Sequence, residues 1–277
     1  MEQNERHGLV ERLDALDLPE GMLALAALGQ AGFVLKAGNT VVYIDPYLSN
    51  AISDGGGPPR AIESPLDPAQ AGRVDAIICT HEHADHTDPA TVLPLAAAAP
   101  AASIFASPQG AALLVEAGME AARIVTPALG ERHTVGGMAI TALPAAHYSY
   151  EVDAEGRSRW MGFVIEADGV TLYHAGDTVV IPELLAALQP YRLDLALLPI
   201  NGRDYFREQQ GIVGNLNTRE VAEFCALLRP RVLIPTHNDL FRENRVHPAD
   251  LVIELERVIP RQRFHFLQPG EVFVYCG

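Results

Sequence analysis

The sequence predicts an α/β fold in which β-sheets are covered by helices on their outer faces. Short β-rich runs come first, and strand-like and helix-like segments alternate after them. The chain has 277 residues, 48% apolar and 20% charged, which is enough material for a large buried core. No internal repeat or domain boundary is evident. We therefore expect one domain over residues 1–277, with residues 1–20 as an N-terminal arm or short helix.

The first expected strands are separated by glycine-containing turns, as in a β-meander. They are Met22–Leu28, Gly32–Lys36 and Thr40–Ile44. The following segment, Ser53–Pro68, contains three consecutive glycines and then two prolines, so it is predicted to be a long loop.

From Val74 onward, apolar runs predict strands, and segments that begin at a cap and a proline or end at a glycine predict helices. The expected strands are Val74–Cys79, Ser103–Ala106, Arg123–Val125, Met138–Leu143, Met161–Glu166, Val170–His174, Leu193–Leu198, Val232–Ile234, Phe264–Leu267 and Val272–Tyr275. The expected helices are Pro89–Ala99 with Thr87 as its N-cap, Pro108–Gly118, Ile181–Leu188, Thr218–Leu228 and Pro248–Val258.

The charge and the apolar pattern exclude several classes of function. The chain has 20 Lys and Arg against 35 Asp and Glu, a formal net charge of −15, which disfavours nucleic acid or an anionic membrane as a partner. No apolar run reaches the ~20 residues of a membrane-spanning helix, and the start of the chain lacks the apolar core of a secretory signal. The three cysteines are scattered, which is typical of a reducing compartment. We expect a cytoplasmic enzyme or binding protein.

The segment His81-x-His83-x-Asp85-His86 directly follows an expected strand. Residues two apart face the same side of an extended chain, so His81 and His83 can hold one ion together. Asp85 and His86 follow as the chain turns, and they are aimed at an adjacent ion. Such a pattern arises by chance in on the order of 10⁻³ of chains of this composition. It indicates a metal site, against the alternative of a solvated polar loop.

Two metal ions need further ligands, and the ends of other expected strands supply candidates. Asp177 follows a strand and a glycine, and its two carboxylate oxygens can bridge two ions. His237 and His147 each follow an apolar strand in the same way. His133, in a polar turn before two glycines, competes with His147 for the first site.

His174 precedes Asp177 by three residues, and three roles stay open for it: a hydrogen-bond donor to a ligand, an acid for the leaving group, or a purely structural residue. Nitrogen and carboxylate ligands without cysteine suit Zn²⁺, Mn²⁺ or Fe²⁺. Ligands that alternate with open positions favour a catalytic site over a structural one.

The whole set of His81-x-His83-x-Asp85-His86, His147, Gly176-Asp177 and His237 resembles the metal pattern of the metallo-β-lactamase superfamily. Asp45, at the end of an expected strand, resembles an early structural aspartate of that superfamily. The resemblance covers the chain from about Met22 to its end. It implies a four-layer αβ/βα sandwich with a dinuclear metal centre between two sheets.

Several segments resemble the L-ascorbate-6-phosphate lactonase group within that superfamily. They are Leu28-Gly-Gln-Ala-Gly32, Leu198-Pro-Ile-Asn-Gly-Arg203-Asp-Tyr205-Phe, Gly214-Asn-Leu-Asn217 and Ile234-Pro-Thr-His237-Asn-Asp239-Leu-Phe. This resemblance implies a lactone substrate and a homo-oligomer. The third motif, Ala146-His147-Tyr148, departs from the group's pattern.

Some of these segments suggest how an anionic substrate is held. Asn217 and Glu220 have capping-box spacing, and a helix start favours an anion. Arg203, Tyr205, Arg207 and Asn215 precede that helix, so we predict a phosphate or carboxylate anchor formed by Arg203, Tyr205, Asn215 and Asn217, with ordinary surface arginines as the alternative.

Our leading hypothesis is a hydrolase in which two divalent ions activate a hydroxide that opens a small anionic, phosphorylated sugar-like lactone. Asp85 would steer the hydroxide, and His174 could protonate the leaving oxygen. A phosphodiesterase or a thioesterase on the same centre is the alternative within enzymes. A non-catalytic metal-binding or ligand-sensing module is the alternative from another class.

Overall fold

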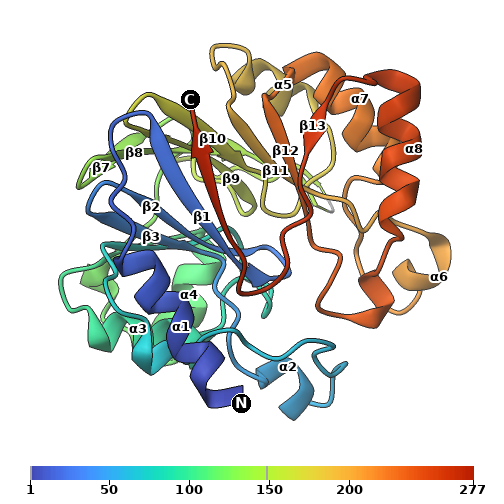
Figure 1. Cartoon of the computed structure of the whole chain (residues 1–277). Coiled ribbons are helices and arrows are strands. Elements are labelled where there is room, and N and C mark those ends of the chain that lie inside the picture. The colour runs from blue at the N-terminus through green and yellow to red at the C-terminus, as the bar shows by residue number, and fades with distance from the viewer. Residues whose placement is uncertain (1, 148) are drawn as a thin grey trace.

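Two seven-stranded mixed sheets form the centre of the molecule (Figure 1). The computed structural model describes residues 2–147 and 149–277. The first sheet has the order β14-β1-β2-β3-β4-β5-β6, with β14 (Val272–Cys276), β1 (Met22–Gly29), β2 (Gly32–Ala37), β3 (Thr40–Ile44), β4 (Ala76–Cys79), β5 (Ser103–Ala106) and β6 (Ile124–Val125). The second has the order β13-β12-β11-β10-β9-β8-β7, with β13 (Arg263–Phe264), β12 (Val232–Thr236), β11 (Leu195–Pro199), β10 (Val170–His174), β9 (Met161–Ala167), β8 (Met138–Pro144) and β7 (Arg132–Val135).

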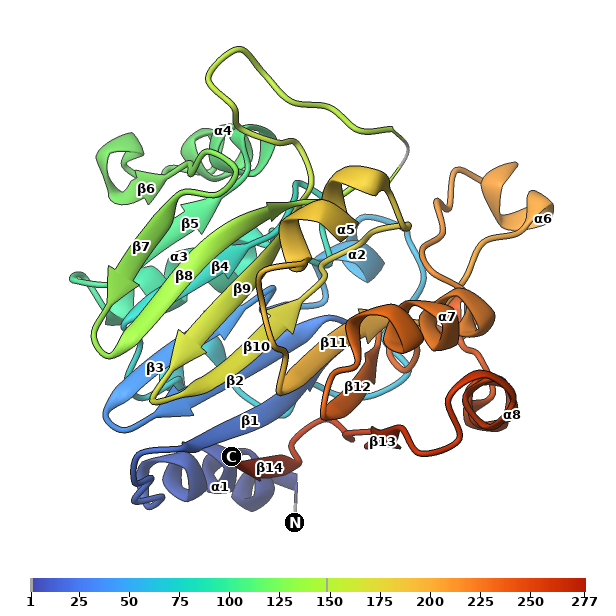
Figure 2. The same ribbon diagram turned by 90° about the horizontal axis from the view of Figure 1, so that it is seen from above.

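The two sheets pack face to face, and helices cover their outer faces (Figure 2). The helices are α1 (Glu2–Asp14), α2 (Ala51–Asp54), α3 (Pro89–Ala98), α4 (Pro108–Glu116), α5 (Pro182–Leu188), α6 (Tyr205–Glu208), α7 (Thr218–Leu228) and α8 (Pro248–Val258). Side chains of α1, α3 and α4 pack on the first sheet, and those of α5, α7 and α8 pack on the second. This is the four-layer αβ/βα arrangement that was predicted.

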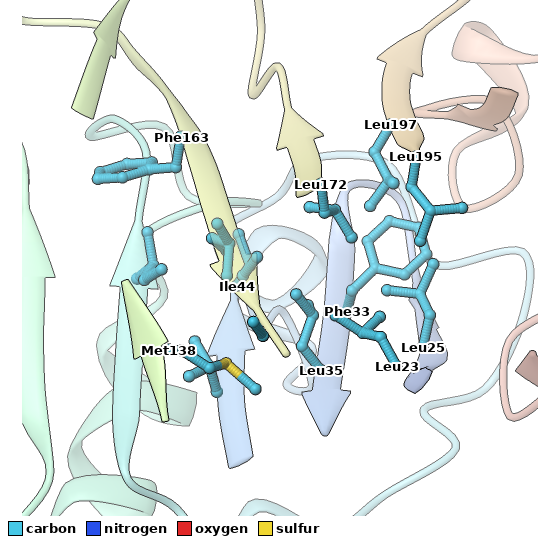
Figure 3. Packing of buried hydrophobic residues seen from close by; sticks show 14 of the residues in the cluster. Leu23, Leu25, Phe33, Leu35, Ile44, Met138, Phe163, Leu172, Leu195 and Leu197 are labelled. Atoms are coloured by element: carbon cyan, nitrogen blue, oxygen red, sulfur yellow. The ribbon is translucent and has the colours of Figure 1, made fainter. Parts of the chain in front are cut away.

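The main apolar core lies between the two sheets, where strand periodicity directs alternate side chains. Leu25 and Phe33 of the first sheet face Leu172, Leu195 and Leu197 of the second sheet (Figure 3). All five side chains are at most 3% exposed. Their burial fixes the two sheets against each other, so residues at the sheet edges have defined positions.

The N-terminal segment forms α1, and a buried lysine holds its end. The Lys36 ammonium group donates hydrogen bonds to the carbonyl oxygens of Leu13 at 2.6 Å and Leu16 at 2.8 Å. These carbonyls lie at and after the last turn of α1, where a helix lacks internal partners. Within residues 1–20, for which an arm or a short helix was expected, the structure describes the helix Glu2–Asp14, which docks on the first sheet. No helix in the described ranges is both long and apolar enough to cross a membrane.

Several local predictions were wrong. The predicted strand Phe264–Leu267 overlaps β13 (Arg263–Phe264) only at Phe264. Residues 132–135 form β7 instead of a polar turn, because this edge strand pairs only with β8 and carries polar, partly exposed side chains that give no apolar signal. The short helix α2 overlaps the start of the predicted loop Ser53–Pro68, and no helix was predicted at the position of α6. Helix α3 is capped by Asp88, whose carboxylate accepts the Ala90 amide, while the Thr87 hydroxyl donates to the His81 carbonyl.

Candidate metal centre

The predicted ligands meet because their strands end at one edge of the two sheets. Strand β4 runs parallel to β3, β10 runs parallel to β11 and β12, and β8 has the same direction as β10. Within the second sheet, the carboxyl ends of β8, β10, β11 and β12 therefore lie on the same side, where α/β proteins place their sites, and the residues after β4 of the first sheet meet them there. Seven predicted ligands follow these ends: His81, His83, Asp85, His86, His147, Asp177 and His237.

The structure arranges these seven residues in two groups. His81, His83, His147 and Asp177 form the first group, and Asp85, His86 and His237 form the second. Within each group, one potential ligand atom from every residue lies within 4.8 Å of the others. The sequence analysis likewise placed His81 and His83 beside one ion and Asp85 and His86 beside another, and the presence of two ions stays a prediction.

Asp177 lies between the two groups. Its Oδ1 is 3.3 Å from His86 Nε2, and its Oδ2 is 3.3 Å from His237 Nε2 and 3.6 Å from His147 Nε2. The carboxylate therefore faces ligands of both groups at once. This placement fits the bridging role that the sequence suggested.

Asp45 contacts His86 of the second group on the side of the ring away from the other ligands' Nε2 atoms, at Nδ1. Its Oδ2 lies 2.7 Å from His86 Nδ1, and it also accepts a hydrogen bond from the Thr80 hydroxyl, while Oδ1 accepts the Thr80 amide at 2.8 Å. Asp45 and His86 are completely buried. A carboxylate on Nδ1 leaves Nε2 of the imidazole to hold a metal ion, which is a common arrangement in metalloproteins.

The backbone at this edge is strained. Among the described residues, five non-glycine residues have positive φ, and Gln30, Asp45 and His237 are three of them, at 58°, 43° and 60°. Left-handed backbone disfavours residues with a Cβ and tends to persist at functional sites. Gly176 has φ of 57°, and a Cβ there would lie 2.8 Å from the Met161 carbonyl oxygen. Only glycine therefore permits the close turn that delivers Asp177.

Burial and neighbouring charges set the pKa values of the ligands in opposite directions. Burial lowers the pKa of His147 to about 4 and that of His81 well below its usual range. Burial also acts to lower the pKa of His237, but the carboxylates of Asp177 and Asp85 outweigh it and raise that pKa to about 9. Without a divalent ion, protons thus supply the positive charge of the second group.

These pKa shifts predict how the stability of the metal-free protein depends on pH. A histidine whose folded pKa lies above its unfolded value of about 6.5 stabilises the fold fully below pH 6.5, and this contribution disappears as the pH rises through the folded pKa. For His237, the free energy of unfolding should therefore decrease between about pH 6.5 and 9, by on the order of 3 kcal/mol. Urea unfolding of chelator-treated protein measures this directly.

His237→Asn is the control for this pH dependence, because asparagine tolerates the left-handed backbone and does not titrate. The decrease should become smaller in that variant. His147 affects the free energy of unfolding at acidic pH. Because its folded pKa is lowered to about 4, its contribution to stability is lost as the pH falls from about 6.5 toward 4. Stability that stays constant or rises from pH 6.5 to 9 would contradict the assignment of His237.

His174 does not fit the role of a leaving-group acid. Its Nε2 donates to the Ala31 carbonyl at 2.8 Å, and its Nδ1 accepts the Gly176 amide at 3.1 Å. Burial lowers its pKa, so the ring is neutral and both nitrogens are occupied by backbone groups. His174 therefore holds the turn before Asp177, which is the structural role among the three that the sequence left open.

His133 is not part of the cluster. It lies on β7, where its Nε2 is 3.2 Å from Glu131 Oε1 and its ring contacts Phe105. His147 instead contacts the rings of His81 and His83, with centroids 5.7 and 5.1 Å away. The structure thus selects His147 over His133 as the candidate ligand.

The predicted anion anchor is not available in this arrangement. Arg203 pairs with Glu220 and donates to the Asn215 carbonyl, and Arg207 pairs with Asp204. The Asn217 side chain caps α7 in the predicted capping box. Tyr205 is 67% exposed, and buried Asn215 donates to Asn201. Arg203, Asn215 and Asn217 therefore stabilise this loop and the start of α7, whereas Tyr205 lies exposed.

Sequence reasoning missed two contacts at the centre. Gln30, in the β1–β2 turn, places its amide nitrogen 2.8 Å from Asp85 Oδ2. Glu82, between two histidines of the motif, pairs with Arg159, whose guanidinium group lies over the Trp160 ring. The sequence did offer one signal for Gln30. It stands in the tight turn Gly29-Gln30-Ala31-Gly32, at a position where glycine is usually needed.

The donor set fits divalent metal ions. Imidazole nitrogens and carboxylate oxygens are ligands for Zn²⁺, Mn²⁺ and Fe²⁺. His81 Nε2 is buried and has no hydrogen-bond partner among the described residues, which is costly unless an ion or a water binds it. The residues present therefore match a metal site.

Comparison with known proteins also identifies a β-lactamase superfamily domain and metal-dependent hydrolases as relatives. The family described as "Beta-lactamase superfamily domain" matches residues 40–238. A "UPF0173 metal-dependent hydrolase" of Pyrobaculum calidifontis is 30% identical over 245 residues, covering 88% of this chain and 96% of the relative. A protein of the same description from Caldivirga maquilingensis is 29% identical over 256 residues, covering 88% and 95%.

Solved structures share the fold. A metallo hydrolase from Ignicoccus hospitalis has a TM-score of 0.70 at 23% identity, with 92% of this chain and 98% of that chain covered. An isothiocyanate hydrolase from Delia radicum gut bacteria has a TM-score of 0.71 at 22% identity, with 92% and 100% covered. Fold, ligand set and sequence agree: the chain belongs to the metallo-β-lactamase superfamily. Within it, the chain falls among the metal-dependent hydrolases described as UPF0173.

Proposed function

We propose that the protein is a dinuclear metal-dependent hydrolase that opens a small lactone. The observation that carries the proposal is the position of Asp177 between two groups of buried or partly buried ligands. Two divalent ions bound there would supply a water of lowered pKa as nucleophile and positive charge for the developing oxyanion.

The residues of the chain have distinct tasks in this proposal. His81, His83 and His147 would hold the first ion, and Asp85, His86 and His237 the second, with Asp177 shared between them. Among the candidate ligands, Asp85 is the more exposed carboxylate, at 17% against 4% for Asp177, so it is the one best placed to orient a nucleophile. Asp45 keeps Nε2 of His86 turned toward the ligands.

The proposal of a lactone substrate rests on the sequence segments that resemble the L-ascorbate-6-phosphate lactonase group. Because Arg203 and Arg207 are engaged in ion pairs, the charge of the substrate needs a direct test. We expect a cytoplasmic enzyme that requires neither nucleic acid nor a membrane, and the same resemblance favours a homo-oligomer.

The test is turnover by purified protein reconstituted with Zn²⁺, Mn²⁺ or Fe²⁺. The substrates are a phosphorylated sugar lactone, a neutral lactone of similar size, a phosphodiester and a thioester. We expect ester opening of a lactone to be fastest, and faster with the phosphorylated compound if the substrate is anionic. Faster phosphodiester or thioester cleavage would replace the lactonase assignment. Full metal loading without turnover of any substrate would favour a sensing module.

A further inference from the structure

Gln30 occupies an unusual place beside the second group of ligands. It lies in the turn between β1 and β2, far in sequence from every predicted ligand. Its side-chain nitrogen is 2.8 Å from Asp85 Oδ2 and 3.1 Å from His237 Nε2. One amide thus reaches two members of the second group.

The backbone of Gln30 is fixed from two sides. Its amide donates to Asp239 Oδ1 at 2.8 Å, and its carbonyl accepts the His237 amide at 2.8 Å. These contacts hold φ at 58°, a conformation that glycine adopts more easily than glutamine. A glutamine in this position therefore costs stability that its side chain or its surroundings must offset.

The side chain does not satisfy both of its ends within the protein. Gln30 is 2% exposed, and its Oε1 is buried without a hydrogen-bond partner among the described residues. A glutamine that only stabilises a turn would be expected to pair both its donor and its acceptor. Here the side-chain nitrogen contacts Asp85 and His237, and the side-chain oxygen has no such partner among the described residues.

We propose that Gln30 is a positioning residue for the second metal ion. Its amide donates to Asp85 Oδ2, which keeps this carboxylate turned toward His237 and His86. Partners that orient a ligand commonly change metal affinity by about 10–100-fold when they are removed. The inference rests on the proposed dinuclear centre, because it assigns Gln30 to one of its two ions.

The test is calorimetric titration of chelator-treated protein with Zn²⁺, compared between wild type and Gln30→Gly. Glycine removes the amide and suits the left-handed backbone, so the metal-free variant should unfold at the same or a higher temperature. We expect two binding steps in both proteins, with one step weaker by about 10–100-fold in Gln30→Gly and the other unchanged.

Asp168→Gly is the matched control. Asp168 also has positive φ, 49°, but it lies in the β9–β10 turn at the opposite end of β10 from the ligands. In both variants glycine replaces a residue with positive φ, so the effect on the backbone is comparable. The zinc affinities of Asp168→Gly should equal those of wild type. Gln30→Met, which keeps the volume of the side chain but cannot donate, should reproduce the weaker step.

The outcomes separate this inference from the proposed function. Two unchanged steps in Gln30→Gly, or an equal weakening of both, would overturn the role of Gln30 while leaving the dinuclear centre intact. Wild-type protein that takes up only one Zn²⁺ would overturn both.

Discussion

Asp177→Asn should lower the rate of lactone opening by about 10³-fold or more, because it removes the negative charge that both groups of ligands share. An asparagine side chain has the same shape, but its neutral amide is a poor bridge between two cations. Steady-state turnover at saturating substrate and metal measures the effect. Elemental analysis of the same samples should show fewer bound ions per chain.

His133→Ala and His147→Ala are matched controls for this prediction. His133 lies on β7 beside Glu131, so its removal should leave turnover and metal content unchanged. His147→Ala should lower both. Circular dichroism must show a folded Asp177→Asn protein, since Asp177 also balances the charge of His86 and His237. A folded variant that retains wild-type turnover would contradict the bridging role.

Asp45→Ala should lower the free energy of unfolding of the metal-free protein by about 3–5 kcal/mol. Burial alone would lower the pKa of His86, but Asp177, Asp45 and Asp85 raise it well above its usual range, which favours the protonated ring in the metal-free protein. Removing Asp45 takes away one partner of that cation and leaves the Thr80 amide without its acceptor. Urea unfolding at pH 7 measures the loss.

Asp75→Ala is the comparison for Asp45→Ala. Asp75 also accepts a backbone amide, that of Val41, but its side chain is 22% exposed and its ion partner Arg73 is 58% exposed. A pair in solvent contributes little, so this variant should lose only about 1 kcal/mol. Asp45→Asn keeps the side-chain volume and should fall between the two. Equal losses in Asp45→Ala and Asp75→Ala would show that His86 does not depend on a buried partner.

Much of the fold could be predicted because strand and helix periodicities are strong in this chain. Apolar runs such as Thr40–Ile44 and Val170–His174 are bounded by glycine or polar residues, and their predicted limits match the structure. The amphipathic segments Thr218–Leu228 and Pro248–Val258 also match. The edge strand β7 could not be predicted, because pairing with β8, and not burial, makes it a strand.

The two groups of ligands could be predicted because each ligand follows a recognisable strand, and the ends of parallel strands meet at one edge. The roles of polar groups around them could not. Whether Arg203 is free or paired depends on Glu220, and whether His174 can give up a proton depends on Ala31 and Gly176. Gln30 reaches Asp85 only because the β1–β2 turn packs against His237.

Anomalous diffraction from crystals of the protein loaded with Zn²⁺ tests the central claim most directly. The account predicts two peaks per chain, about 3.5–4 Å apart. One peak should be surrounded by His81, His83 and His147 and the other by Asp85, His86 and His237, with Asp177 between them. A single peak, or peaks away from these side chains, would contradict a dinuclear hydrolytic centre.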